Sequence, residues 1–404
     1  MGLEMRIWYL PLICFLILFS LVLGYVFLSG VDVSSISTEP EVQFVYATSG
    51  IMPQLLNTSQ VDAFFVWESV VSTADLGGIG KVIARDADIP PDRKWENTAC
   101  NVLVMRNSFI TEYPEIASLL SAITIAGIQR IHEDPDEAMN ITAGWVYGSH
   151  PIRSAGLTLN PIELEKNAFP HINFTDKARL PDPGYLQQSL YDYEMTLKSP
   201  SSRENVTVYT RALELLTGSE PELSHIPPYV RIGYLPSADL YAPLYVSIMG
   251  YEKICDRYGF CLVPDSHMSG RPTECQLRVQ NSTITRIRLL PGQVGGGVMT
   301  GLGQNAIDVA YIGSVPSLMQ ISMGNPAAII HSINAGGSGL VVDDSAPCTD
   351  WDSFIVWVKS RSSSGRPLII AVPQSSIQEE MMREAFEYEG VQISLYGLPT
   401  FGAL

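Results

Sequence analysis

Residues 301–318, GLGQNAIDVAYIGSVPSL, form the stretch around which the chain is organised. The pattern predicts the end of a helix, a short join that ends in Asp308, and a buried strand over 309–312. A loop that opens with Gly313 and Ser314 follows this strand. Open α/β sheets bind their ligands at loops of this kind, beyond the carboxyl ends of the strands. The segment therefore predicts a ligand-binding edge of an α/β sheet.

Residues 55–70, LLNTSQVDAFFVWESV, repeat the same order of features far upstream. A polar join precedes Asp62, an apolar strand over 63–66 follows, and the next loop opens with Trp67 and Glu68. Two such units predict two lobes that face one cleft. The alternative is that two unrelated strand–loop–helix units belong to one large sheet.

Strands and helices alternate along most of the remaining chain, which predicts an α/β fold with mostly parallel sheets. The segment 217–228, TGSEPELSHIPP, is the clearest linker. We expect further strands over 42–46, 100–105, 230–234, 327–333, 368–372 and 391–396, and helices over 53–57, 114–132, 208–216, 242–250 and 376–389.

The composition is that of a large, acidic, globular protein. The 404 residues carry a formal net charge of −17, and 46% of them are apolar. A chain of this length can form two or three lobes, and its acidity argues against a nucleic-acid partner. Cys255 and Cys261 are close enough in sequence for a short-loop disulfide, with Cys275 and Cys348 as other candidates. Free buried thiols are the alternative.

The first residues predict a membrane anchor. Residues 7–28 form an uncharged apolar run long enough to cross a bilayer, and Arg6 precedes the run. We expect a short cytoplasmic segment over 1–6, a tether over 29–40, and a main domain outside the cell membrane. A cleaved signal peptide is the alternative.

Four stretches resemble a known family of binding proteins: VRIGYLPSADLYAPLYVSIMG, GLGQNAIDVAYIGSVPSL, AVPQSSIQEEMMREAFEYEGV and QVDAFFVWES. Together they are similar to the solute-binding proteins of nitrate, sulfonate, taurine and bicarbonate ABC importers, and to pyrimidine-precursor-binding relatives. The resemblance covers nearly everything from residue 41 onward. It implies a two-lobed type II periplasmic-binding fold that closes on its ligand by hinge motion, with ABC permease subunits as partners and no cofactor.

The order of the two halves departs from that family. Residues 41–216 resemble the half that normally comes last, and residues 229–404 resemble the half that comes first. We therefore expect a circularly permuted module, with one lobe from 229–345 plus 98–216 and the other from 346–404 plus 41–92. Segments 390–404 and 41–55 are similar to one another, as two versions of one strand–turn–helix segment. The alternative is a truncated gene whose halves do not complete each other.

The candidate ligand-binding residues lie in loops at strand ends and in the first turns of helices, where unpaired N–H groups favour an anion. A serine pair can instead be a plain N-cap, Trp67 can simply pack between lobes, and Asp239 can cap helix 242–250. Asp62 and Asp308 are predicted to be structural. The candidates are Ser237, Asp239, Gly313, Ser314, Gly337 and Ser338 in one lobe, and Gln374, Ser375, Ser376, Trp67 and Glu68 in the other.

These features predict capture of a small anion or zwitterion rather than catalysis. The six histidines show no HExxH or paired metal spacing, and the chain has no Walker loop. We expect no catalytic residue, no metal and no cofactor. The alternatives are a ligand-sensing ectodomain, a synthase related to the pyrimidine-binding group, and a non-functional remnant.

Overall fold

The computed structural model describes residues 41–148, 150–154, 156–181, 205–236, 238–265 and 271–396. The predicted anchor over 7–28 and the tether over 29–40 lie outside these residues. Within the described ranges, no helix combines the length and the apolar character needed to cross a membrane.

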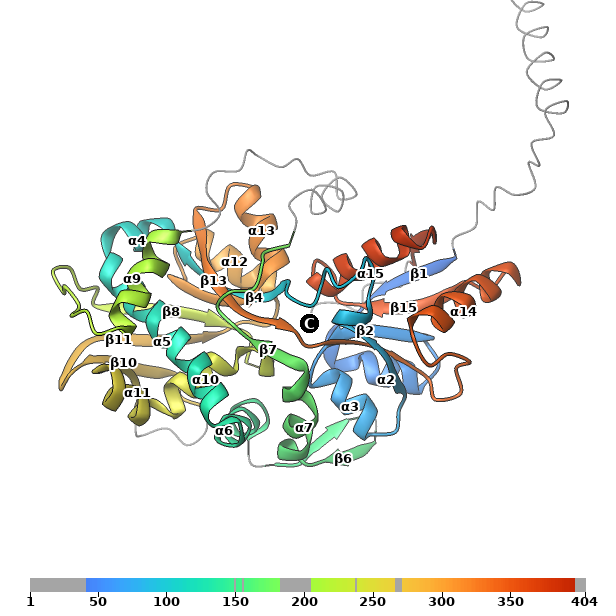
Figure 1. The fold of residues 1–404 in the computed structure, drawn as a ribbon, viewed down its shortest axis with the longest axis horizontal. Coiled ribbons are helices and arrows are strands. Elements are labelled where there is room, and N and C mark those ends of the chain that lie inside the picture. The colour runs from blue at the N-terminus through green and yellow to red at the C-terminus, as the bar shows by residue number, and fades with distance from the viewer. Residues whose placement is uncertain are drawn as a thin grey trace, which may run out of the picture. The chain divides into compact units, whose positions relative to one another are not determined.

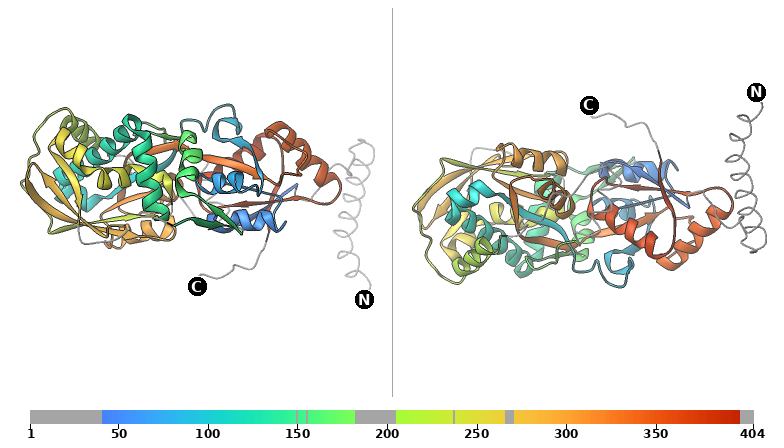
Figure 2. Two further views of the ribbon diagram at one scale, coloured as in Figure 1. Left: turned by 90° about the horizontal axis from the view of Figure 1, so that it is seen from below. Right: turned by 90° about the horizontal axis from the view of Figure 1, so that it is seen from above.

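A six-stranded sheet and an eight-stranded sheet, each with helices against it, form two lobes that lie side by side (Figures 1 and 2). The six-stranded sheet has the order β16 (Ile393–Leu395), β1 (Val42–Tyr46), β15 (Leu368–Val372), β2 (Ala63–Trp67), β14 (Ser338–Val342) and β3 (Lys81–Arg85). We call this part of the molecule lobe 2. Its helices are α2 (Met52–Asn57), α3 (Val70–Leu76), α14 (Trp351–Ser363) and α15 (Ile377–Tyr388), with short 3-10 helices η3 (Ser49–Ile51) and η4 (Asp86–Asp88).

The eight-stranded sheet forms lobe 1. Its order is β7 (Ile172–Phe174), β13 (Ala327–Gly336), β4 (Ala99–Arg106), β12 (Val309–Gly313), β8 (Tyr229–Tyr234), β11 (Ser282–Pro291), β10 (Glu274–Val279) and β9 (Phe260–Pro264). Its helices are α4 (Asn107–Glu112), α5 (Pro114–Glu133), α6 (Pro135–Tyr147), α9 (Val206–Leu216), η6 (Asp239–Tyr241), α10 (Ala242–Met249), α11 (Tyr251–Tyr258), α12 (Gly295–Gly303) and α13 (Ser314–Ser322). The segment β5 (Ile152–Ser154), β6 (Leu157–Leu159), α7 (Pro161–Ala168) and η5 (Phe169–His171) leads from α6 to β7.

The two-lobed α/β architecture agrees with the sequence, but the sheets are mixed rather than mostly parallel. Within the described residues, five of the twelve strand pairings in the two large sheets are parallel. The sequence pattern missed strands β3, β9 and β10, although it did indicate a strand that ends near Leu289 and Leu290, within β11. Hairpins create antiparallel pairs, and so do strands such as β4 and β14 that pair with partners distant in sequence. An alternation of strands and helices along the sequence does not reveal either kind of pair.

Both sheets combine strands from the two halves of the sequence. Strands β1, β2 and β3 of lobe 2 precede the 217–228 linker, whereas β14, β15 and β16 follow it. In lobe 1, strand β4 from the first half lies between β13 and β12 from the second half. Strand β7, also from the first half, pairs with β13. Among the described residues, neither half therefore contains all the strands of either large sheet.

The similar segments near the two chain ends lie next to each other. Strand β16 pairs in parallel with β1 at the edge of the six-stranded sheet, with Val42 opposite Ile393 and Phe44 opposite Leu395. The remaining five strands form a continuous sheet without β16. Strand β16 is thus an additional edge strand beside the segment that it resembles.

The chain passes from lobe 1 to lobe 2 at Gly336 and Gly337, not at residue 345 as the sequence suggested. Both glycines have positive φ angles, of 68° and 81°. A Cβ atom on Gly337 would lie 3.0 Å from side-chain atoms of both Ile172 and Leu240. Glycine is needed here because other residues disfavour this conformation and because the space is filled. The strand that follows, β14, joins β2 and β3 of lobe 2.

The two aspartates of the repeated sequence pattern make the same backbone contacts in the two lobes. The Asp308 backbone N–H donates to the Arg231 carbonyl at 2.9 Å, and its carboxylate accepts the Arg231 N–H at 2.9 Å. The Asp62 N–H donates to the Ile369 carbonyl at 2.8 Å, and its carboxylate accepts the Ile369 N–H at 2.9 Å. Each aspartate therefore ties the entry of its strand to the neighbouring parallel strand. The prediction that both are structural agrees with these contacts.

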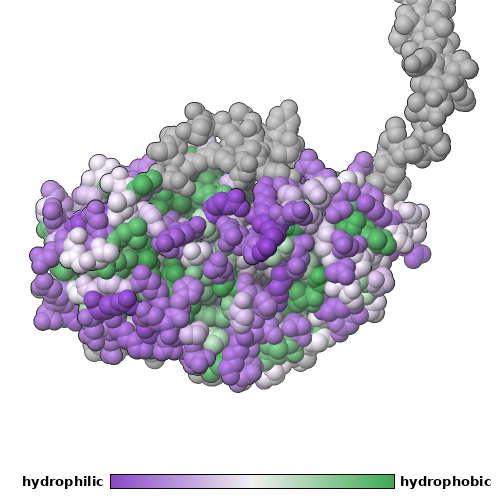
Figure 3. Space-filling model, viewed as in Figure 1, coloured by the Kyte–Doolittle hydropathy of each residue, from purple (hydrophilic) through white to green (hydrophobic). Residues whose placement is uncertain are grey.

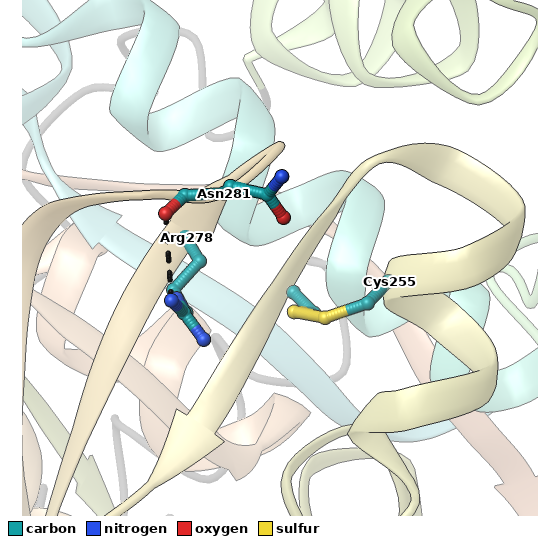
Figure 4. Close-up of a disulfide and its surroundings, with 4 residues drawn as sticks. Cys255, Arg278 and Asn281 are labelled. Atoms are coloured by element: carbon teal, nitrogen blue, oxygen red, sulfur yellow. Dashed lines mark hydrogen bonds between the residues drawn. A yellow bond between two sulfur atoms is a disulfide. The ribbon is translucent and has the colours of Figure 1, made fainter.

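A disulfide joins Cys255 at the end of α11 to Cys261 in β9, as the short spacing predicted (Figure 4). The two Cα atoms are 5.0 Å apart, and the bond closes the turn through Gly259. Beside it, Arg278 donates to the Asn281 carbonyl in the β10–β11 hairpin. Cys275 and Cys348, the other candidates for a disulfide, are instead free buried thiols.

The surface seen in Figure 3 is mostly hydrophilic, with apolar residues in smaller groups between polar ones. The largest buried apolar cluster contains residues of both lobes, among them Phe44 and Phe65 of lobe 2 and Val102 and Ile312 of lobe 1. Apolar burial therefore continues from one lobe into the other.

We predict that Asp308→Asn destabilises the protein strongly. Asp308 is 4% exposed and is held by Arg231 and Arg106, whose guanidinium groups approach its carboxylate at 2.7–2.9 Å. Breaking a buried ion pair from one side costs about 3–5 kcal/mol. Urea unfolding of the full chain at pH 7 measures this loss in the free energy of unfolding.

The effect of Asp308→Asn on the free energy of unfolding should also depend on pH. Burial alone would raise the pKa of Asp308, but the hydrogen bonds from Arg231 and Arg106 lower it. The stabilisation is therefore present at neutral pH and disappears as the pH falls through the lowered folded pKa. The exposed Asp92→Asn is the matched control. A loss of less than about 1 kcal/mol at pH 7 would contradict the assignment.

Candidate ligand-binding site

A cavity of about 460 Å³ lies between the two lobes. Its size is within the range that small-molecule sites usually occupy. Residues at or just beyond the ends of β1, β2 and β15 line it from lobe 2, and residues of β4, η6, α12 and α13 line it from lobe 1. The polar lining residues are Thr48, Ser49, Trp67, Asn101, Tyr241, Gln293, Gln320, Gln374, Ser375, Ser376 and Gln378.

Among the described lining residues, no side chain carries a formal charge. Several polar side chains nevertheless have unused hydrogen-bonding capacity. Within the described part of the chain, nothing pairs with the hydroxyls of Thr48 and Tyr241, the indole N–H of Trp67, or the amides of Gln320 and Gln374. A ligand or water would have to satisfy these groups.

Three helices begin at the cavity wall. Gly295 and Gly296 form the first turn of α12, Gly313 precedes α13, and Ile377 opens α15. The first N–H groups of a helix lack partners inside the helix and carry partial positive charge. The glycines of α12 also allow a bound group to approach the backbone closely. The cavity can therefore favour negative charge without a Lys or Arg side chain.

The start of α15 is held by its own residues. The Ser376 hydroxyl accepts from the Glu379 N–H at 3.2 Å and contacts the Pro373 carbonyl at 2.6 Å. The Ser375 N–H donates to the Glu379 carboxylate at 2.7 Å, and Tyr46 donates to the same carboxylate at 2.6 Å. Ser376 is thus an N-cap, the plain alternative for this serine pair, and its hydroxyl is largely committed. Ser375 and Gln374 remain at the cavity wall.

The floor of the cavity comes from β4. Asn101 donates to the side-chain oxygen of Asn334 at 3.1 Å, and Gln378 donates to the Ser338 hydroxyl at 3.0 Å. Cys100 lies beside Gln378 and is 5% exposed. Burial, assisted by the nearby charge of Asp86, raises the pKa of the Cys100 thiol to about 12. The thiol is therefore protonated at neutral pH and is a poor nucleophile.

The structure brings five of the predicted site residues together at the cavity and places five elsewhere. Trp67, Gly313, Gln374, Ser375 and Ser376 line it. Ser237 lies outside the described residues. The five that do not line the cavity are Asp239, Ser314, Gly337, Ser338 and Glu68.

Each of these five has a structural environment that differs from the prediction. Ser314 is fully buried and donates to the Ala99 carbonyl at 2.6 Å, because the first residue of α13 turns back against β4. The Gly337 carbonyl accepts the Glu68 N–H at 2.6 Å, and the Ser338 N–H donates to Asp86 at 2.7 Å. Glu68 pairs with Arg85, and Asp239 is buried behind the lining residues Ala238 and Leu240.

Several lining residues were missed by the sequence reasoning, and some had a usable signal. Thr48 and Ser49 come just beyond the end of β1, and Trp67 lies at the end of β2. Gln293 comes just before the Gly-rich first turn of α12. Cys100 and Asn101 had no signal, because they lie within a strand that is almost entirely buried.

We predict that Ser376→Ala lowers the free energy of unfolding by about 1 kcal/mol, the usual cost of losing an N-cap. Ser376→Asp retains an acceptor for the Glu379 N–H and should lose clearly less. Urea unfolding of the three proteins compares them. Equal losses for the alanine and aspartate variants would show that the hydroxyl contributes in some way other than capping.

No protein-family model matches the chain. An uncharacterised protein of Methanocaldococcus jannaschii is 27% identical over 132 residues, which are 32% of this chain and 86% of that relative. This similarity covers a third of the chain and assigns no activity.

Proposed function

We propose that the chain is a membrane-tethered, extracytoplasmic solute-binding protein that captures a small anion or zwitterion for an ABC importer. The observation that supports this proposal best is the cavity between the lobes, with its uncharged lining and its unused hydrogen-bonding groups. Such a cavity suits reversible capture. The sequence resemblance to binding proteins of the nitrate, sulfonate, taurine, bicarbonate and pyrimidine classes supports the same function.

The helix starts at the cavity favour the negative part of such a ligand. The N-termini of α12, α13 and α15 supply partial positive charge, and the Trp67 ring supplies an apolar wall with one N–H donor. The chemistry of the wall also supports binding without turnover. Its one sulfur nucleophile among the described lining residues, Cys100, has a pKa near 12.

Closure of the two lobes is the proposed mechanism of capture. Lining residues come from both lobes, so a ligand that contacts both stabilises the arrangement in which they lie together. Gly336 and Gly337 provide a connection whose backbone can change conformation with little steric cost. Release to a permease then requires the lobes to separate.

We predict that a compound of these classes stabilises the full chain against heat. A ligand at a hundredfold its Kd adds about 2.7 kcal/mol to the free energy of unfolding. A thermal-shift screen of nitrate, taurine, alkyl sulfonates, bicarbonate and pyrimidines measures this, and calorimetry gives the affinity of any hit. If none of these compounds shifts the melting temperature, the proposed ligand classes are wrong.

Two substitutions locate the site of any hit. Trp67→Ala and Gln374→Ala should each weaken binding at least about tenfold, since each removes a group that faces the cavity. Gln60→Ala, at an exposed position outside the cavity, is the matched control for Gln374. Unchanged affinity in both cavity variants would place the ligand elsewhere.

A further inference from the structure

Three buried carboxyl groups lie near enough to one another, where the two lobes touch, for their charges to interact. We call Glu68, Glu165 and Asp239 the interlobe acid cluster. Glu68 follows β2 in lobe 2, and Asp239 opens η6 in lobe 1. Glu165 lies on α7, which packs against α6 of lobe 1 and α3 of lobe 2. All three residues are 0% exposed. The cluster adjoins the cavity, because Trp67 and Leu240 line the cavity and are the chain neighbours of Glu68 and Asp239.

The cluster has too few partners for three ionised groups. Glu68 forms an ion pair with Arg85 and accepts a hydrogen bond from Ser72 at 2.7 Å. One oxygen of Asp239 accepts the Leu240 N–H at 3.1 Å. The other meets no described donor in hydrogen-bonding geometry, although the Ser69 side chain is near enough to lower the pKa of Asp239. Neither carboxyl oxygen of Glu165 has a partner among the described residues. An ionised carboxylate in such a position is strongly destabilising unless something neutralises it.

The other titratable groups around the cluster do not provide that neutralisation. Arg85 of β3 is its one cation among the described residues and already pairs with Glu68. Tyr147 at the end of α6 is neutral, because burial and the charge of Glu165 raise its pKa well above the usual range. Asp86 of η4 adds a fourth acid, and burial with the charge of Arg85 lowers the pKa of His171 in η5. Among the described residues, no group of three potential ligands is arranged to hold a metal ion.

Protonation is the neutralisation that these surroundings favour. Burial raises the pKa of Glu165 well above its usual range, and the charges of Asp239 and Glu68 add to the rise. Burial and the charge of Glu68 raise the pKa of Asp239 in the same direction. Burial also raises the pKa of Glu68, although Arg85 and Ser72 oppose the rise.

We propose that the interlobe acid cluster is a proton-binding site that controls the contact between the two lobes. When Glu165 and Asp239 are neutral, the lobes remain together around the cavity. When they ionise, repulsion among three buried carboxylates from both lobes drives the lobes apart. This proposal rests on the proposed function in one respect, because it uses the same separation of the two lobes. The proton-binding site acts without a ligand, so the proposal can be tested independently of ligand capture.

The sign of the expected pH dependence follows from the raised pKa values. In the folded state the cluster keeps protons that the unfolded chain releases near pH 4. The contribution of the cluster to stability is therefore greatest at low pH and falls as the pH rises through the folded pKa values. The ligand-free full chain should melt roughly 5 °C lower at pH 8 than at pH 5.5. Asp86, whose burial raises its pKa to about 6, contributes to the same trend. The test of the cluster is therefore how much the change in melting temperature between pH 5.5 and pH 8 differs between the variants and the wild type.

Glu165→Gln tests the site, since the amide is neutral at every pH. We expect it to melt higher than the wild type at pH 8 and to show a smaller difference between the two pH values. Glu163→Gln on the same helix is the matched control, because the Glu163 side chain is 61% exposed. Asp239→Asn serves as a second variant if Glu165→Gln does not fold. A pH dependence equal to that of the wild type in the variant would overturn the proposal.

Neutron scattering of the full chain in contrast-matched detergent tests the lobe separation. The radius of gyration of the wild type should increase between pH 5.5 and pH 8, and that of Glu165→Gln should remain at its low-pH value. A wild-type radius that does not change with pH would overturn the proposal. Failure of every compound in the thermal-shift screen would instead contradict the proposed ligand classes and leave these pH measurements unaffected.

Discussion

Asp62 and Asp308 fix the entries of two central strands, because the backbone N–H and the carboxylate of each aspartate both bond to the backbone of the strand beside it. Each aspartate exchanges two hydrogen bonds with a residue of the neighbouring parallel strand, Ile369 in lobe 2 and Arg231 in lobe 1. These contacts set the register at the entry of β2 and β12. Because register is set at the entry, the positions at which both strands end are also determined.

The ends of these strands determine what faces the cavity. Strand β2 ends at Trp67 and β12 ends at Gly313, and both residues line the cavity. The helices that begin beyond the strands of both lobes direct their N-termini to the same space. The two lobes thus use the same local arrangement, and the cavity lies where the two copies meet. The buried acids lie immediately behind this wall, so the chemistry of the cavity and the contact between the lobes are physically linked.

The two-lobed α/β fold could be predicted because buried strands and helix starts have strong local patterns. The strands over 42–46, 63–66 and 309–312 agree with β1, β2 and β12 to within a residue at each end. The antiparallel pairings could not be predicted, because strand direction depends on partners distant in sequence, such as β14 with β2. The position of the lobe crossing at Gly336 and Gly337 depends on side chains of Ile172 and Leu240, which the local sequence does not indicate.

The candidate site was predictable to the extent that it follows strand ends. Trp67 and Gly313 end their strands, Gln374 comes shortly after β15, and all three line the cavity. Ser314 comes directly after β12, but its hydroxyl donates to the Ala99 carbonyl. Adjacent residues at a helix start face different directions, and only tertiary packing decides which one is exposed. The role of Glu165 had no sequence signal, because an acidic residue near a helix start is ordinarily a solvated one.

The central claim is that the two halves of the chain complete each other's sheets. The most direct test is to introduce a protease site after His225 in the 217–228 linker, cleave it, and pass the product through a size-exclusion column without denaturant. Both fragments should elute together, because each of the two large sheets contains strands from before and after the cut. Elution of the two fragments as separate folded or unfolded species would contradict it.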